Sequence, residues 1–273
     1  MSASRGKDTK LSPMSGWVVS HVAPGLLLVA LIVVVAGGAM LLTTWVRRQF
    51  PALNRDEHND VTKFTYTFIG FIYAFLIGFV VSSMWGQISG TDSNARTEGA
   101  AAVEMARKLD AFDTADRDRI RQRLLDYEKA AIAEWGDGRG VRLPETDRAL
   151  AQLSEAYQQV AATTDSQKSA LTTSRASLDT ISQARTVRLL TAREDTGPPW
   201  PLWAVIFLTS AMVVGTVVIY GVEKAGMHYP MVAIVGLVVA TNLFLILELS
   251  HPFIGGISTT PDPLYEVISV LNG

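Results

Sequence analysis

Four long apolar runs dominate this sequence, and the second of them constrains the fold most strongly. It extends from Phe64 to Gly86 without a charged residue, close to the ~20 residues that a helix needs to cross a bilayer. Most charged residues lie instead in one central segment, 87–197. This separation predicts an all-α, polytopic membrane protein with four transmembrane helices and a helical soluble domain between spans two and three. The other three apolar runs cover roughly residues 17–46, 198–222 and 229–249.

The order of these segments predicts a division of the chain into five parts. They are a polar N-terminal tail (1–15), a hairpin of spans one and two (16–86), the soluble domain (87–197), a hairpin of spans three and four (198–250) and a C-terminal tail (251–273). An even number of spans puts both termini and the soluble domain on one side of the membrane. Lys and Arg flank the spans on both sides, so the positive-inside rule leaves the orientation open.

Span one has two local features that bear on its helix. Pro24 predicts a kink in its first turns, because proline cannot continue a helical hydrogen-bond ladder. Residues 36–39, Ala-Gly-Gly-Ala, form a small-residue patch suited to close contact with another helix.

Span two is sorted into two faces. Small residues recur at every fourth position and give a face on which another helix can pack closely: Gly70, Ala74, Gly78 and Ser82. Phenylalanines at spacings of four, three, four and four line an adjacent face; we call them the Phe stripe: Phe64, Phe68, Phe71, Phe75 and Phe79. Aromatic residues commonly fill space between helices or face lipid, and a ring of them can also line a narrow apolar passage. The sequence leaves both interpretations open.

The segment after span two reads as helical throughout. No proline separates span two from the Ala-, Glu- and Arg-rich stretch 91–109, so we expect the membrane helix to continue into it. Asp113 or Thr114 is expected to cap a second helix, Pro144 to begin a third, and residues 163–166 to precede a fourth that runs to about Arg193. The glycines at 136–140 predict a helix-terminating loop, because neither a strand nor a Lys-Ser/Thr pair accompanies them.

Composition excludes several classes of function. With 24 Lys and Arg against 26 Asp and Glu, the net charge of −2 gives no basic footprint for nucleic acid. The absence of cysteine excludes disulfides, zinc–thiolate sites and cysteine nucleophiles. None of the four histidines is paired at metal-ligand spacing. No catalytic constellation is visible, so we expect neither an enzyme nor a cofactor.

The polar loop before span two and the residues after it suggest a metal or proton-transfer site formed by Asp56, Glu57, His58, Asn59 and Asp60. The preferred interpretation is that Asn59 or Asp60 caps span two, with the acids near its positive end.

Two pairs of charged residues are candidate sites. Glu248 ends span four, and an ionisable residue in a membrane segment is a functional candidate by default. It also lies close enough to the boundary to meet water, and His251 could pair with it on a helical face. A structural tether and a proton- or ion-sensing role stay open for Glu248 and His251.

Arg185 and Arg188 lie about one turn apart before span three. We favour lipid-headgroup contact or pairing with acids of a neighbouring helix, such as Glu98 or Glu104. The alternative is an electropositive vestibule that concentrates anions.

Several short motifs occur in order around the four spans and carry a family resemblance. They are His58-Asn59-Asp60-Val61, Val80-Val81-x-x-x-Trp85, Tyr127 with Glu134-Trp135, Arg185 and Arg188 before Leu189-Leu190, Pro201-x-Trp203, and His251-Pro252-Phe253-x-Gly255. From about Trp45 to Pro261 the chain resembles the bacterial bestrophin-like membrane family of unknown function.

The resemblance implies a distant similarity to bestrophins, which are pentameric anion channels with an aromatic-lined second span and cytosolic soluble helices. It implies that this chain is a homo-oligomer in the cell membrane that passes a small anion, with the Phe stripe as the neck and 87–197 in the cytoplasm. Calcium gating is not carried over, because the acids after span four are only Glu248, Asp262 and Glu266. The competing hypothesis is a non-conducting membrane scaffold or sensor whose helical domain binds a partner.

Overall fold

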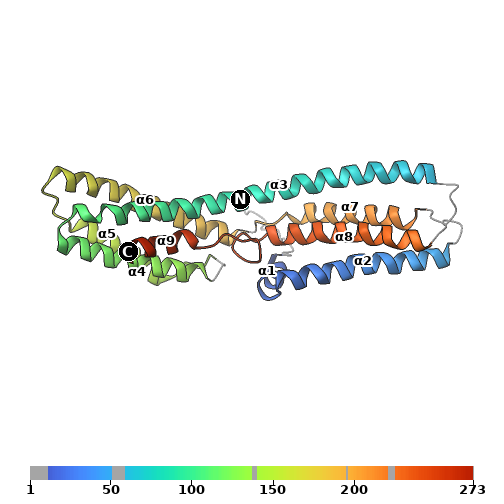
Figure 1. Cartoon of the computed structure of the whole chain (residues 1–273), viewed down its shortest axis with the longest axis horizontal. Coiled ribbons are helices and arrows are strands. Elements are labelled where there is room, and N and C mark those ends of the chain that lie inside the picture. The colour runs from blue at the N-terminus through green and yellow to red at the C-terminus, as the bar shows by residue number, and fades with distance from the viewer. Residues whose placement is uncertain (1–11, 51–58, 137–139, 195, 221–224, 273) are drawn as a thin grey trace, which may run out of the picture. The chain divides into compact units, whose positions relative to one another are not determined.

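The computed structural model describes residues 12–50, 59–136, 140–194, 196–220 and 225–272, without the side chains of 12–15, 59–63 and 225. The regular elements of this part are all helical (Figure 1), which confirms the all-α prediction. In chain order they are α1 (Ser12–His21), α2 (Pro24–Gln49), α3 (Asn59–Lys108), the 3-10 turn η3 (Leu109–Ala111), α4 (Thr114–Trp135), α5 (Pro144–Gln158), α6 (Asp165–Arg193), α7 (Trp200–Val218), α8 (Ala225–Leu249) and α9 (Asp262–Asn272).

Four helices of the described chain, α2, α3, α7 and α8, are long and apolar enough to cross a membrane. They coincide with the four apolar runs, so the predicted number of spans is confirmed. The first run differs in detail, since it is divided into α1 and α2 instead of kinked. Ala23 is extended (φ −57°, ψ 135°) and Pro24 opens α2. Proline restricts the residue before it to such a conformation and favours the first position of a helix.

Helix α3 is continuous from Asn59 to Lys108, which confirms that the helix of span two runs on past Gly86. The side chains of Asn59 and Asp60, together with residues 56–58, lie outside the described part, so the cap proposed there stays a prediction. Asp113 is the residue before α4, as expected, but its side chain does not cap the helix. Its Oδ1 accepts a hydrogen bond from Gln167 Nε2 at 3.2 Å instead.

The chain forms two compact units. The first unit consists of Met1–Gly86 and Gly197–Ile257, and the second of Gln87–Thr196 and Ser258–Gly273. The C-terminal residues from Ser258 onward, including α9, therefore belong with the charged central segment.

The first unit is held together by close contact between α2 and α8. A Cβ atom added to Gly236 would lie 2.7 Å from the Cα of Ala36, so the two backbones touch where only glycine fits. Ala39, one turn on, is buried in a cluster with Val217 and Val232. The small-residue patch at 36–39 thus packs against another helix, as the sequence predicts.

Polar side chains tie the other end of α2 to α7 and α8. Arg47 Nη1 donates to His228 Nδ1 at 2.8 Å, which leaves the hydrogen on Nε2 to donate to the carbonyl of Val217 at 3.0 Å. Thr44 Oγ1 and Tyr229 OH are 3.1 Å apart. Because a guanidinium can only donate, Nδ1 of His228 must accept. The bonds to Arg47 and Val217 therefore fix the tautomer of His228 with its hydrogen on Nε2.

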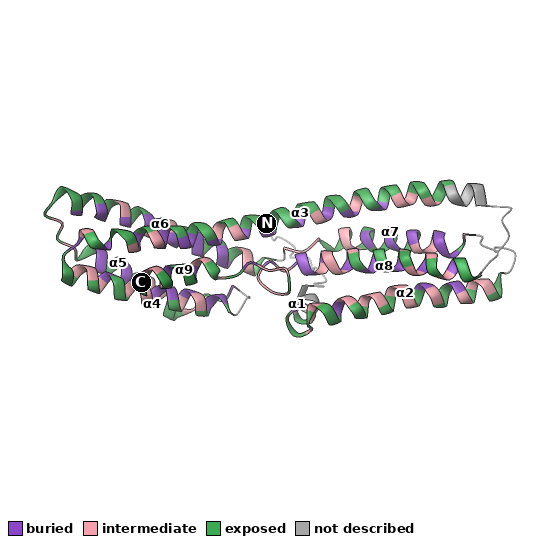
Figure 2. Cartoon of the chain, viewed as in Figure 1, coloured by how far each residue is buried: buried purple, intermediate pink, exposed green. Residues whose placement is uncertain are grey.

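The second unit buries one face of α4 (Figure 2). The buried residues recur at spacings of four, three, four and four, as one helical face does: Ile120, Leu124, Tyr127, Ala131 and Trp135. Helix α9 adds Leu264, Val267 and Leu271 to this core. A Cβ atom on Gly99 of α3 would lie 2.6 Å from the carbonyl oxygen of Pro263. A side chain at that position would therefore push the start of α9 away from α3.

The α2–α8 contact predicts different outcomes for two glycine-to-alanine variants. Gly236→Ala forces a methyl group against Ala36, and we expect overpacking to cost about 1–3 kcal/mol. Gly215→Ala on α7 is the control, because its added Cβ has no atom within 4 Å. Thermal unfolding of the full-length protein in detergent should show a lower midpoint for Gly236→Ala alone. Equal midpoints for both variants would contradict the close contact.

Candidate functional site

The Phe stripe of α3 lies on the surface of the described chain. Phe64, Phe68, Phe71, Phe75 and Phe79 are 75, 57, 71, 72 and 68% exposed. All five side chains are thus more than half uncovered, and the chain's own helices do not use them as packing residues. Lipid or another copy of the chain must cover this face.

The face of α3 that the first unit buries is a different one. The hydroxyl of Tyr73 lies 3.5 Å from Ser210 Oγ of α7. The buried residues recur at spacings of four, three and four, as one helical face does: Tyr73, Ile77, Val80 and Met84.

The small-residue face finds no partner within the described chain. Gly70 and Gly78 have open space where a Cβ would be, and Ala74 and Ser82 are exposed. Close packing on this face therefore stays a prediction that concerns other copies of the chain.

Glu248, at the end of α8, is fully buried, so the expectation that it meets water is wrong. Its Oε2 accepts a hydrogen bond from the amide of Gly256 at 2.7 Å, and its Oε1 has no partner among the described residues. The chain turns back over the carboxylate because α8 ends at Leu249 and a loop follows. Because α8 ends before His251, Glu248 and His251 do not share the helical face that was expected for them. A sensing role for this pair stays a prediction.

Two glycines let the loop pass close to this carboxylate and to the start of α2. Gly255 has φ +100°, a conformation that L side chains rarely adopt, and a Cβ there would lie 2.8 Å from Glu248 Oε2. A Cβ on Gly256 would lie 2.8 Å from Pro24. The Gly-Gly pair is visible in the sequence, but its role depends on a loop contact that helical periodicity does not reveal.

Arg185 joins α6 to α4 and α5 in the interior of the second unit. Its Nε and Nη2 donate to the two carboxylate oxygens of Glu134 at 2.8 and 2.7 Å, and its Nη1 donates to Asp147 Oδ1 at 2.8 Å. Arg185 is 2% exposed and the Glu134 side chain 0%. This is a bidentate, charge-assisted pair of the strong kind.

Arg188, one turn on, joins α6 to α3. Its Nε and Nη2 donate to Glu98 at 3.1 and 3.3 Å, and its guanidinium lies 4.7 Å from the ring centre of Trp135. Tyr127 OH donates to the same Glu98 at 3.0 Å. We call Arg185, Arg188, Glu98, Glu134, Tyr127, Trp135 and Asp147 the buried ion network.

The buried ion network shows where the two arginines predicted as a pair, Arg185 and Arg188, lie and which acids they contact. Arg188 is 4% exposed, so both guanidiniums belong to the interior of the unit and not to an open electropositive surface. The expected partner Glu98 is found, whereas Glu104 accepts from Ser177 Oγ at 3.4 Å instead. Sequence reasoning missed Glu134, although it stands beside Trp135 in a motif that had been singled out.

The network also shifts the pKa values of its members. Burial alone would lower the pKa of the Arg185 guanidinium, but its hydrogen bonds to Glu134 and Asp147 raise the pKa above its usual range. Burial raises the pKa of Tyr127 well above its ordinary value, and the nearby carboxylates of Glu98 and Glu128 add to the rise. The phenol therefore stays neutral and the guanidinium charged at any physiological pH.

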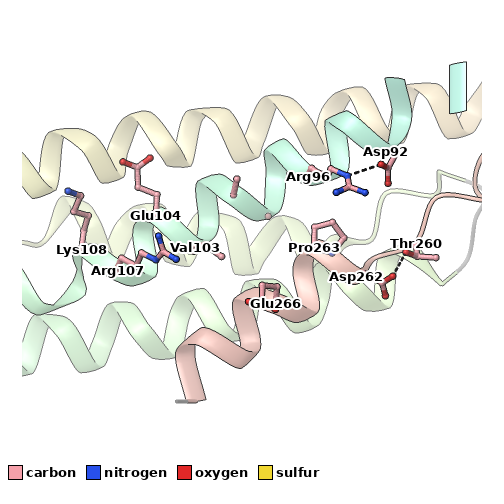
Figure 3. A pocket seen from close by; sticks show the side chains of 12 residues that line it. Asp92, Arg96, Val103, Glu104, Arg107, Lys108, Thr260, Asp262, Pro263 and Glu266 are labelled. Atoms are coloured by element: carbon pink, nitrogen blue, oxygen red, sulfur yellow. Dashed lines mark hydrogen bonds and ion pairs between the residues drawn. The ribbon is translucent and has the colours of Figure 1, made fainter. Parts of the chain in front are cut away.

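A groove of about 830 Å³ lies between α3 and the start of α9 within the second unit (Figure 3). Its lining carries both signs of charge. Arg96 and Asp92 form an ion pair of 2.8 Å near one end, while Arg107 and Lys108 lie near the other (Figure 3). This mixture does not select an anion or a cation.

Known proteins provide the identity of this architecture. A family model described as a Bestrophin-like domain matches residues 33–264. The chain belongs to this family. With four candidate spans, the bestrophin-like chain is a multi-pass membrane protein. No curated protein matches it in sequence.

Solved structures show the same fold at low sequence identity. A variant of a bacterial bestrophin homologue from Klebsiella pneumoniae is 14% identical, with a TM-score of 0.65 over 91% of this chain and 97% of that chain. A second variant of that homologue gives 13% and 0.64 over 91% and 98%. A structure described as a membrane protein gives 13% and 0.63 over 91% and 97%.

The family-like motifs of the soluble segment converge on one place in this bestrophin-like chain. Tyr127, Glu134, Trp135, Arg185 and Arg188 are far apart in sequence, yet all five belong to the buried ion network. These motifs therefore hold α3, α4 and α6 together and do not form an exposed ligand site.

The buried ion network predicts a large effect for Glu134→Gln. Loss of this carboxylate leaves the Arg185 charge with Asp147 alone, and breaking a buried pair costs about 3–5 kcal/mol. Glu155→Gln on α5 is the control, since Glu155 is exposed and surface changes stay within about 0.5 kcal/mol. Thermal unfolding in detergent should show a strongly lowered midpoint for Glu134→Gln only. A midpoint equal to that of Glu155→Gln would contradict the role given to the network.

Proposed function

We propose that this bestrophin-like protein is a homo-oligomeric anion channel in which the α3 helices line the pore and the Phe stripe forms its neck. One observation carries the proposal: α3 presents five aligned phenylalanines, each more than half exposed, beside a separate face that the chain itself buries. In lipid, apolar helices gain little from burying hydrophobic surface against each other. Lipid exposure alone therefore gives no reason to align phenylalanines on one stripe.

The chemistry of the stripe suits an anion. A ring of benzyl groups presents positively polarised edges, and an apolar constriction gates flow by losing its water. The small-residue face beside the stripe, with open space at Gly70 and Gly78, provides a surface on which the α3 helix of another copy can approach closely.

We further propose that the second unit lies in the cytoplasm, as in the bestrophins that the family resembles. The four spans put both chain ends on that side. A scaffold or sensor that does not conduct is the competing function, and measurements of ion flux and oligomeric state distinguish the two.

Chloride flux from liposomes tests the neck. Phe75→Ala and Phe79→Ala widen the constriction and weaken its tendency to lose water, so we expect flux to rise several-fold over that of the unchanged protein. Phe207→Ala is the matched control, because Phe207 is 52% exposed on α7 and outside the stripe.

Equal flux for all three variants would remove the neck from α3. Protein-containing liposomes that leak no faster than protein-free ones, with a monomer or dimer in detergent, would favour the scaffold or sensor.

A further inference from the structure

One buried acid of the second unit, Glu128, is not part of the buried ion network. It lies on α4, the helix that also carries three residues of that network. Glu128 of α4 is 1% exposed. Both of its carboxyl oxygens are buried without a hydrogen-bond partner among the described residues. Burying a polar group without a partner is costly, and an unpaired charge costs far more. A side chain of this kind needs an explanation.

The charges around Glu128 are already balanced without it. Three arginines and three acids pair with one another in and at the rim of the network: Arg142 with Asp147, Arg185 with Glu134 and Asp147, and Arg188 with Glu98 and, at 3.6 Å, Glu134. If Glu128 were ionised, it would add a fourth negative charge to these three arginines and three acids. The ion pairs described in this interior contain no further cation that could pair with Glu128.

The helices packed around α4 present known groups to Glu128. Glu98 of α3 acts on it as a repelling charge and Arg188 of α6 as an attracting one, but Arg188 is already engaged with Glu98. Tyr127 is its neighbour on α4. Asp147, the acid of the network on α5, is held by two arginines.

Helix α9 leaves this balance unchanged. It turns Leu264, Val267 and Leu271 to the core, and its acids Asp262 and Glu266 are exposed. Burial raises the pKa of the Glu128 carboxyl well above its ordinary value of 4.5, Glu98 raises it further, and Arg188 lowers it only in part.

We propose that Glu128 is a proton-binding site of the second unit: the neutral acid fits the closed unit, and loss of its proton loosens the packing of α4 against α3 and α6. The ligand of this site is the proton itself. Burial without a hydrogen-bond partner and the nearby charge of Glu98 both favour the neutral carboxyl over the carboxylate.

The direction of the pH effect follows from proton linkage. The folded state holds the Glu128 proton at pH values at which the unfolded chain releases it, so folding is favoured by low pH. This contribution is complete below the ordinary pKa and is lost as the pH rises toward the raised folded value. Within that window the unfolding equilibrium constant should increase by up to about tenfold per pH unit.

Glu128→Gln in the full-length protein in detergent tests the site through stability. The amide keeps the shape of the neutral acid and cannot ionise. We expect the variant to unfold at nearly the same denaturant concentration as the unchanged protein at pH 5, and at a higher one at pH 8. Glu155→Gln should follow the unchanged protein at both values, and Glu134→Gln should be less stable at both.

A parallel pH dependence for Glu128→Gln and the unchanged protein would overturn the proposal. Glu128→Met, which keeps the approximate volume without a polar group, repeats the comparison if the glutamine variant does not fold.

Infrared difference spectra recorded along a pH titration upward from pH 5 report on the carboxyl proton directly, which unfolding measurements do not. A protonated buried carboxyl has a C=O stretch distinct from that of a carboxylate. The unchanged protein and Glu155→Gln should lose one such band as the pH rises, and Glu128→Gln should lack it. Persistence of the band in Glu128→Gln would assign the proton to another residue.

Discussion

The central constraint on this molecule is that, in the described part of the first unit, the chain's own helices cover only one face of α3. Tyr73, Ile77, Val80 and Met84 meet the rest of the first unit, while the Phe stripe and the small-residue face stay open. In a bilayer an open apolar face needs no cover, because lipid tails solvate it. We therefore attribute the alignment of phenylalanines and small residues to oligomer assembly or ion passage, and the proposed channel accounts for both with one helix.

The second unit depends on a different interaction, the buried ion network. Buried ion pairs contribute little net stability, because desolvation offsets their attraction, but removal of one partner is costly. The network therefore specifies which residues of α3, α4 and α6 meet more than it strengthens their contact. Glu128 lies outside this balanced set, and neither of its buried carboxyl oxygens has a hydrogen-bond partner among the described residues. On the proposal made for Glu128, its proton keeps the charges of the network balanced.

The sequence predicted what depends on local pattern and missed what depends on tertiary contact. Apolar length located the four spans, and the absence of proline predicted the continuous α3. A membrane helix is apolar on every face, and the residues of each face repeat with the same helical spacing. Periodicity therefore did not show which face of α3 is buried. The covering of Glu248 by the loop through Gly255 and the pairing of Glu134 with Arg185 arise from residues brought together only by folding.

Cross-linking between copies tests the central claim most directly. The chain has no cysteine, so a single introduced thiol is the only one that can react. Phe75→Cys in membranes should form covalent dimers with an oxidant or a short bis-maleimide, because each chain carries one thiol and a disulfide requires Cα atoms within about 7 Å. Phe207→Cys on α7 should remain a monomer under the same conditions. Equal cross-linking at both positions, or cross-linking at Phe207 alone, would contradict a Phe stripe that faces other copies of α3.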